Sequence, residues 1–202
     1  MPTPSDIAFS CACGAVSGTL LEAGPSQGDH VVCHCTDCQD FGRYLGKSER
    51  IVGVAGGTPL YQCRCARMRM QTGRDKLACL HLTDKPTLRW YAACCRTPMF
   101  NTYANGRVPY VTAMVGNCDP NRREAVFGPP IGHLFTGDAT GDVGDVPKMS
   151  MTRMVGRSMR RIVKDVVSGD RRRSELFDGQ TLQPIATPHR LTARERQDLA
   201  EK

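Results

Sequence analysis

The sequence predicts a mainly β protein with a helical C-terminal extension, and three observations support this prediction. Short apolar runs recur between residues 7 and 115 and are separated by turns that contain glycine or proline, as in an antiparallel β core. Several cysteines lie in short C-x-C turns, a pattern typical of metal-binding knuckles. After residue 148, apolar residues recur at helical spacing beside Arg and Lys. We therefore divide the chain into a β domain over residues 7–147 and a basic helical extension over residues 148–202.

Composition limits the class of protein. Hydrophobic residues make up 40% of the 202 residues, which is enough for a packed core. No apolar run approaches the length of a membrane span, and residues 1–10 lack the pattern of a secretory signal. Eleven cysteines without an export signal favour thiolate ligands over a disulfide framework. We therefore expect a cytoplasmic protein.

The strands can be placed in order along the β domain. Two are expected within residues 7–21, on either side of Cys11 and Cys13, where Gly14 allows the positive φ that a knuckle needs. Residues 31–32 are expected to form a strand that leads into a second cysteine cluster, and Phe41 and Gly42 are expected to form a turn. Further short strands are predicted at residues 51–54, 58–63, 68–71, 77–82, 88–91 and 110–115.

The second cluster, Cys33-His34-Cys35-Thr36-Asp37-Cys38, is the most informative stretch. Three thiolates so close together form a soft, anionic pocket that suits zinc better than a hard cation. If the fourth tetrahedral position stays open, the ion can do chemistry, whereas a distant fourth ligand would make the site structural. Both hypotheses remain open at this stage. A disulfide is disfavoured, because cysteines two or three residues apart rarely reach bridge geometry.

Other residues near these clusters have plainer interpretations. The His34 side chain should point away from an ion held by its neighbours, in a supporting or surface role, and His133 is expected to be a loop histidine. Cys63 and Cys65 form a third C-x-C, which we interpret as surface thiols although a shared strand face would permit joint metal binding. Cys79 is expected to be a small buried hydrophobe.

The extension carries most of the net charge of +7, since residues 148–202 hold 13 Lys/Arg and 7 Asp/Glu. Gly169 is expected to end its first helix, and Thr192 with Glu195 forms a capping box that should begin a second one. We expect the apolar stripe of the first helix to pack on the β core or on a second copy of the chain, giving a homo-oligomer. No membrane contact is expected, and nucleic acid is the less favoured partner. The stripe consists of Met151, Met154, Val155, Met159, Ile162, Val163, Val166 and Val167.

Three motifs taken together resemble a known family. They are C-x-C-G-x-V at residues 11–16, C-H-C-x-x-C at residues 33–38, and R-W-Y followed by C-x-T-P at residues 89–98. This combination is similar to the glutathione-dependent formaldehyde-activating enzyme family, which includes the centromere protein V-like proteins, over about residues 7–115. The resemblance implies an Mss4-like β fold, two zinc sites, and carbon–sulfur lyase chemistry on a glutathione–aldehyde adduct.

The resemblance also implies roles for individual cysteines. Cys11 and Cys13 match the first half of a structural zinc site, and Cys95 matches the last ligand of its second half. The family has an earlier cysteine where this chain has Ala92. The fourth ligand is therefore the neighbouring Cys94 or a cysteine from elsewhere, or else the site is three-coordinate or empty. The catalytic zinc ligands implied by the family are Cys33, Cys35 and Cys38.

Two functions from different classes follow. The leading hypothesis is a zinc-dependent carbon–sulfur lyase-like enzyme that acts on a small thiol–aldehyde adduct, with the substrate thiol at the open position of the Cys33/Cys35/Cys38 site. The alternative is a non-catalytic, zinc-stabilised interaction module whose basic tail binds an acidic partner.

Overall fold

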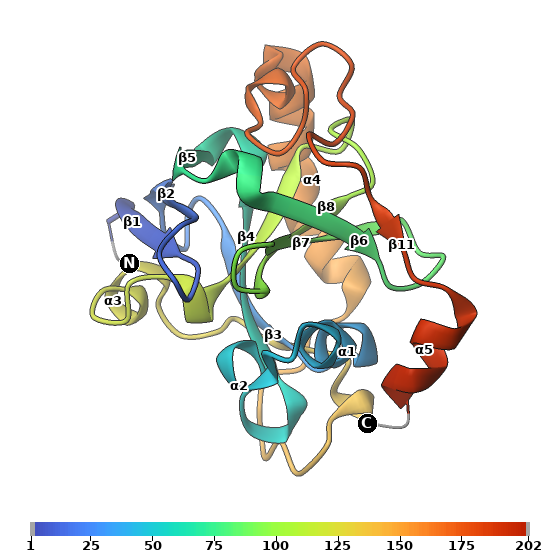
Figure 1. Ribbon diagram of the computed structural model, residues 1–202. Coiled ribbons are helices and arrows are strands. Elements are labelled where there is room, and N and C mark those ends of the chain that lie inside the picture. The colour runs from blue at the N-terminus through green and yellow to red at the C-terminus, as the bar shows by residue number, and fades with distance from the viewer. Residues whose placement is uncertain (1–2, 201–202) are drawn as a thin grey trace.

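A computed structural model describes residues 3–200, which form two β-sheets and five α-helices (Figure 1). The smaller sheet has the spatial order β1 (Ser5–Ser10), β2 (Ser17–Ala23) and β5 (Met68–Thr72). The larger sheet has the spatial order β10 (His133–Leu134), β3 (Asp29–Cys33), β4 (Thr58–Arg64), β9 (Tyr110–Met114), β8 (Thr97–Tyr103), β7 (Thr87–Ala92), β6 (Leu77–His81) and β11 (His189–Arg190). The helices are α1 (Thr36–Leu45), α2 (Ser48–Ile51), α3 (Arg123–Phe127), α4 (Met151–Ser168) and α5 (Ala193–Ala200).

The prediction of a mainly β protein is therefore confirmed, with one refinement. The six central strands of the larger sheet pair antiparallel, as do the three strands of the smaller sheet. The two short edge strands pair parallel instead, β10 with β3 and β11 with β6. Each edge strand holds only two residues, which is too short for a sequence pattern to predict.

The larger sheet separates two apolar clusters. Leu88 and Trp90 of β7 belong to the first cluster, which also contains residues of the smaller sheet such as Ile7 and Leu20. The second cluster contains Phe41 of α1 together with other residues of α1, the sheet and the C-terminal segment. Side chains alternate between faces along a strand, so Arg89, which lies between Leu88 and Trp90, points toward the second cluster.

Two local predictions were wrong. Phe41 and Gly42 do not form a turn but lie inside α1, where Cys38, Phe41 and Leu45 share the buried face at helical spacing. Residues 51–54 do not form a strand, because Ile51 ends α2 and Val54 begins a 3-10 helix. Short apolar runs cannot be assigned to strand or helix from periodicity alone, which explains the second error.

The helices of the extension were placed correctly. Ser150 caps the N-terminus of α4 by accepting from the Arg153 amide, and Gly169 ends the helix with a left-handed φ of 76°. The capping box before α5 forms as expected, with the Glu195 amide donating to Thr192 Oγ1 over 3.2 Å and the Thr192 amide to Glu195 Oε2 over 2.8 Å. The division of the chain into two domains at residue 147 stays a prediction. The last two residues of the extension, 201–202, lie outside the described part of the chain.

A helix that crosses a membrane must be both long and predominantly apolar. Among residues 3–200, none of the helices combines the length and apolar character that a membrane crossing requires.

Two candidate metal centres

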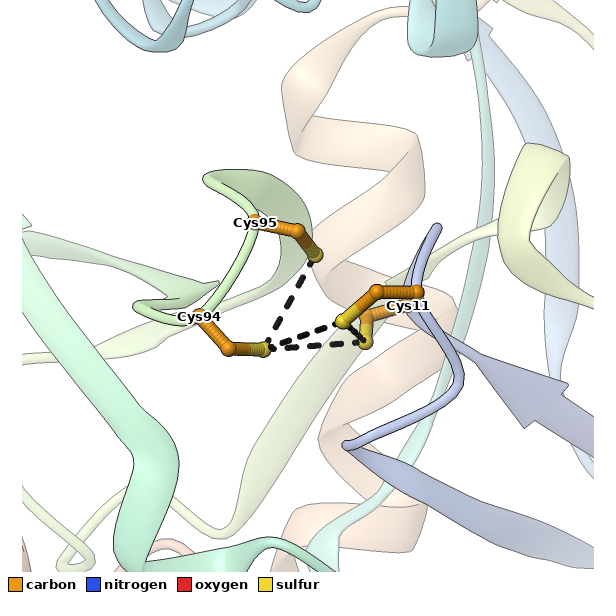
Figure 2. Close-up of side chains that lie close together, drawn as sticks. Cys11, Cys94 and Cys95 are labelled. Carbon is orange, nitrogen blue, oxygen red and sulfur yellow. Dashed lines mark hydrogen bonds between the residues drawn. The ribbon is translucent and has the colours of Figure 1, made fainter.

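Four cysteines from two distant turns lie close together, and Figure 2 labels Cys11, Cys94 and Cys95 among them. The β1–β2 turn supplies Cys11 and Cys13, and the β7–β8 turn supplies Cys94 and Cys95. All four sulfur atoms lie within 4.8 Å of one another, and the measured Sγ–Sγ contacts range from 3.4 to 3.9 Å. A tetrahedral zinc with Zn–S bonds near 2.3 Å has ligand edges of about 3.8 Å. This four-cysteine group therefore has the dimensions of a closed tetrahedral site.

Both turns are shaped by backbone hydrogen bonds that aim the sulfur atoms. Gly14 adopts a left-handed φ of 77°, which lets the chain reverse so that the Val16 amide donates to Cys11 Sγ over 3.3 Å. Thr97 Oγ1 accepts from the Ala12 amide over 3.0 Å and lies 3.1 Å from Cys95 Sγ. Thr97 thus connects the two turns without being a ligand itself.

The adjacent cysteines Cys94 and Cys95 have opposite acidities in the metal-free protein. Partial loss of solvation beside the other cysteines, together with hydrogen bonds to Cys13 and Cys95, raises the pKa of the exposed Cys94 to about 12. Burial also acts upward on Cys95, but hydrogen bonds from Thr97 and Cys13 outweigh it and lower the pKa of Cys95 to about 6. Cys95 is therefore mostly a thiolate at neutral pH in the metal-free protein.

The cysteine trio, Cys33, Cys35 and Cys38, lies in the second apolar cluster, at the junction of β3 and α1. Its sulfur atoms lie within 4.8 Å of one another, with Cys33 Sγ and Cys35 Sγ 3.3 Å apart. Among the described residues, no fourth Cys, His, Asp or Glu ligand atom joins this group. Cys33 and Cys38 are buried, whereas Cys35 is half-buried and is the most accessible ligand. The trio therefore provides three sulfur ligands and leaves a tetrahedral ion one position short.

The trio also lies in an electrostatic setting that favours a thiolate. Cys35 is the N-cap of α1 and Cys38 lies in its first turn, where the helix dipole favours negative charge. Hydrogen bonds from Cys33 and Cys35, with further help from Arg89, hold the pKa of Cys38 well below its usual range despite complete burial. The shared hydrogen bonds raise the pKa of Cys33 correspondingly.

Arg89 is the one functional residue in this centre that we did not predict. Arg89 is 4% exposed, and its guanidinium donates to Cys38 Sγ over 3.4 Å and to Asn101 Oδ1 over 3.2 Å and lies 3.9 Å from Asp37. The guanidinium also lies over the Phe41 ring, 5.7 Å from its centroid. The signal was an arginine in the middle of an otherwise apolar strand, but the sequence does not say which face of the strand meets the cysteines.

His34 points away from the trio, as predicted, but it is buried and not at the surface. Its Nδ1 lies 3.0 Å from the Ala55 carbonyl, which can only accept, so Nδ1 carries the proton. Its Nε2 lies 3.0 Å from His133 Nδ1, and the two rings stack. The Gln39 amide donates to the His34 carbonyl over 2.7 Å. These contacts fix the backbone between the cysteine ligands.

The remaining cysteines do not join either centre. Cys63 and Cys65 are buried, which corrects the expectation of surface thiols, and burial raises the pKa of Cys63 to about 12. Cys79 is buried as predicted, and Cys118 is buried as well. A cavity of about 570 Å³ lies between β3, α2 and α3, but none of the trio lines it. This cavity is therefore separate from the trio.

Seven cysteines proposed as metal ligands are thus brought together in two groups that could hold metal ions, and Cys94 lies where the missing fourth ligand of Cys11, Cys13 and Cys95 is needed. Their catalytic and metal-binding roles stay predictions.

Comparison with known proteins gives a family but no function. No curated protein matches the chain. A crystal structure of a Rhodobacter sphaeroides protein is similar at 15% sequence identity, covers 59% of this chain and 97% of that chain, and has a TM-score of 0.37. A family model described as "Family of unknown function (DUF6151)" matches residues 5–187, so the chain belongs to that family.

Proposed function

We propose that the protein is a zinc-dependent carbon–sulfur lyase-like enzyme that acts on a small thiol–aldehyde adduct. The observation that carries this proposal is the difference in ligand number between the two centres, four sulfur atoms in one and three in the other. A closed tetrahedral shell is typical of structural zinc, whereas three protein ligands are typical of zinc that binds a substrate. The all-sulfur donor sets favour zinc over calcium, magnesium or manganese in both centres.

The chain's own residues supply the environment for this chemistry. Three thiolates around a divalent ion leave a net charge of −1, and the buried Arg89 guanidinium beside Cys38 neutralises it. Asn101 and Asp37 hold the guanidinium in place. A neutral centre is better able to accept one further anionic sulfur than a charged one. Zinc bound there would act as a Lewis acid that lowers the pKa of a substrate thiol at the fourth position.

The proposed reaction balances without an oxidant or reductant. The substrate sulfur adds to the aldehyde carbon, a C–S bond forms, and the C=O π electrons move to oxygen. The proton that the thiol released ends on that oxygen. The reverse reaction breaks the C–S bond and releases the aldehyde.

The finer assignment rests on the resemblance described above. It supports glutathione as the thiol, formaldehyde as the aldehyde, and an Mss4-like fold related to the glutathione-dependent formaldehyde-activating enzymes and the centromere protein V-like proteins. Eleven free cysteines favour a reducing compartment such as the cytoplasm.

The test is the rate of adduct formation between glutathione and formaldehyde, followed by NMR exchange in wild type and in Cys38→Ala. We expect Cys38→Ala to lose catalysis while keeping the ion of the four-cysteine group and its fold. Cys79→Ala is the matched control, because Cys79 is equally buried but belongs to neither group. A wild-type protein that carries zinc but gives only the uncatalysed rate with thiol and aldehyde would refute the proposal.

One observation favours the alternative of an interaction module. Arg153, Arg160 and Lys164 are exposed along α4, so an acidic partner would find a row of cations there. This alternative would be favoured if the protein bound an acidic partner with an affinity that falls steeply with salt concentration and showed no catalysis of the thiol–aldehyde reaction.

A further inference from the structure

Helix α4 has an unusual orientation: ion pairs lie between the helix and the rest of the protein, and most of its apolar side chains face outward. The Arg64 guanidinium pairs with the buried Asp165 carboxylate, and Arg157 and Arg161 pair with the buried Asp29 over 2.8 and 2.6 Å. Ion pairs, and not an apolar stripe, therefore hold this helix against β3 and β4. A single amphipathic helix on a globular domain normally has the opposite arrangement.

The outward face carries a continuous apolar row at a spacing of four residues. Met151, Val155, Met159, Val163 and Val167 are between 41% and 82% exposed, although these residue types are usually buried. Val166 adds a sixth exposed side chain beside the row. Of the two expected packing surfaces, the β core is therefore excluded for most of the stripe, since only Met154 is buried, and packing on a second copy stays a prediction.

The geometry points to a two-fold homodimer in which the outward rows of two α4 helices pack antiparallel. The row is nearly symmetrical about Met159, with a valine four residues away on each side. A two-fold axis at Met159 would place each Met159 against its counterpart and each Val155 against the partner's Val163. Such an interface is self-complementary, as a two-fold contact must be.

Charge at the two ends of α4 supports a second copy as the occupant. The segment before the helix, residues 136–150, contains three exposed aspartates (Asp138, Asp142 and Asp145) and a single basic residue, Lys148. The turn after the helix contains Arg171, Arg172 and Arg173. In Figure 1 this turn lies at the top of the view, whereas the acidic segment lies toward the bottom. Antiparallel pairing therefore brings the acidic end of each copy toward the basic end of the other.

The area of the contact determines how strong the dimer can be. A helix of 18 residues is about 27 Å long. One face of a helix of this length buries less area than the roughly 800 Å² per partner of a standard interface. We therefore expect a reversible dimer with a dissociation constant on the order of 10 μM. A lipid surface is a poorer fit, because the row lacks the Trp, Phe and Leu side chains that anchor interfacial helices.

The test is sedimentation velocity on the full-length protein over a range of concentrations around the expected dissociation constant. Met159→Glu should place two carboxylates at the two-fold axis and weaken the dimer by at least about 100-fold. Val54→Glu is the matched control, because Val54 is an exposed apolar residue outside α4, and it should leave the dimer unchanged. Unchanged circular dichroism and metal content would show that both variants fold.

A charge exchange separates this dimer from other modes of association. Asp142→Lys with Asp145→Lys should weaken the dimer, and adding Arg171→Glu with Arg173→Glu should restore it. A protein that is monomeric at every concentration would overturn the inference. So would a dimer insensitive to Met159→Glu, or binding of α4 to phosphatidylserine-containing vesicles by a protein that stays monomeric without them.

Discussion

The two cysteine groups offer the same sulfur ligands but differ in burial and in their place in the fold. The four-cysteine group joins two hairpin turns that lie about eighty residues apart in the chain, and Cys13 and Cys94 remain exposed. The trio comes from one short segment at a helix N-terminus, lies among apolar residues, and has Arg89 beside it. If both groups hold zinc as proposed, the complete ligand shell would stabilise the fold, and the incomplete one beside Arg89 would be open to a substrate.

The largest effect should follow from opening the closed group. Cys13→Ser removes one of four ligands from an exposed position, so little packing is lost with it. Loss of a structural ion belongs to the small class of changes that cost more than about 4 kcal/mol. We expect the free energy of unfolding to fall by at least this amount, measured by thermal or denaturant unfolding. A Cys13→Ser protein as stable as wild type would show that this group does not hold the fold together.

Removal of Arg89 should affect the other centre. Arg89→Met leaves a buried thiolate without its cation, and such losses cost about 3 to 5 kcal/mol. Metal affinity of the trio should also fall, by roughly 10- to 100-fold, because Arg89 supports a ligand. Competition with a chelator measures this affinity. Arg43→Met is the matched control, since Arg43 pairs with Asp40 at the half-exposed surface of α1, where pairs contribute less than about 1 kcal/mol. Equal effects of the two variants would contradict the role given to Arg89.

These two centres also show what a sequence can and cannot predict. Cys33, Cys35 and Cys38 lie within six residues, so their meeting follows from chain connectivity alone. The meeting of Cys11 with Cys95 depends on where two turns lie in the fold, and only the family resemblance pointed to it.

The errors have physical causes as well. Helix α1 was missed because its glycine and aromatic suggested a turn, although three buried side chains had helical spacing. Helix α4 was predicted correctly, but its orientation was not, because buried ion pairs override the usual rule that the apolar side faces inward. Arg89 was quoted within a motif without a role, since a strand pattern does not show what lies across each face.

The different pKa values of the adjacent residues Cys94 and Cys95 predict different reactivities that depend on pH. In metal-free protein, the pKa of Cys95 near 6 and that of Cys94 near 12 predict that iodoacetamide alkylates Cys95 first at pH 7, with a rate midpoint near pH 6. The pKa of Cys95 is lowered by folding, so its contribution to stability is present above the ordinary thiol pKa of about 9 and is lost as pH falls toward 6.

Thr97→Val tests the cause of that acidity, because it removes the hydroxyl beside Cys95 Sγ. The alkylation midpoint of Cys95 should move to higher pH in this variant. An unchanged midpoint, or preferential labelling of Cys94 in the wild type, would contradict the assignment.

The smallest effect concerns Arg96, which links the two centres. Arg96 has a left-handed φ of 58°, and its guanidinium donates to the carbonyls of Tyr44 over 2.6 Å and Leu45 over 3.2 Å, at the end of α1. Arg96→Ala loses these bonds and keeps the strain, at a cost of about 1 to 2 kcal/mol. Arg96→Gly should cost about 1 kcal/mol less, because glycine adopts this φ freely. Equal stability of the two variants in urea unfolding would show that the backbone there is not strained.

The central claim is that the protein holds two separate ions, one closed and one open. The most direct test is elemental analysis of the metal content of wild type, Cys33→Ala and Cys94→Ala, each purified without added metal. We predict two zinc ions in wild type, and one zinc ion in a folded Cys33→Ala protein. Cys94→Ala should lose the other ion together with much of its stability. A wild type without zinc, or a Cys33→Ala protein that loses both ions at once, would contradict the account.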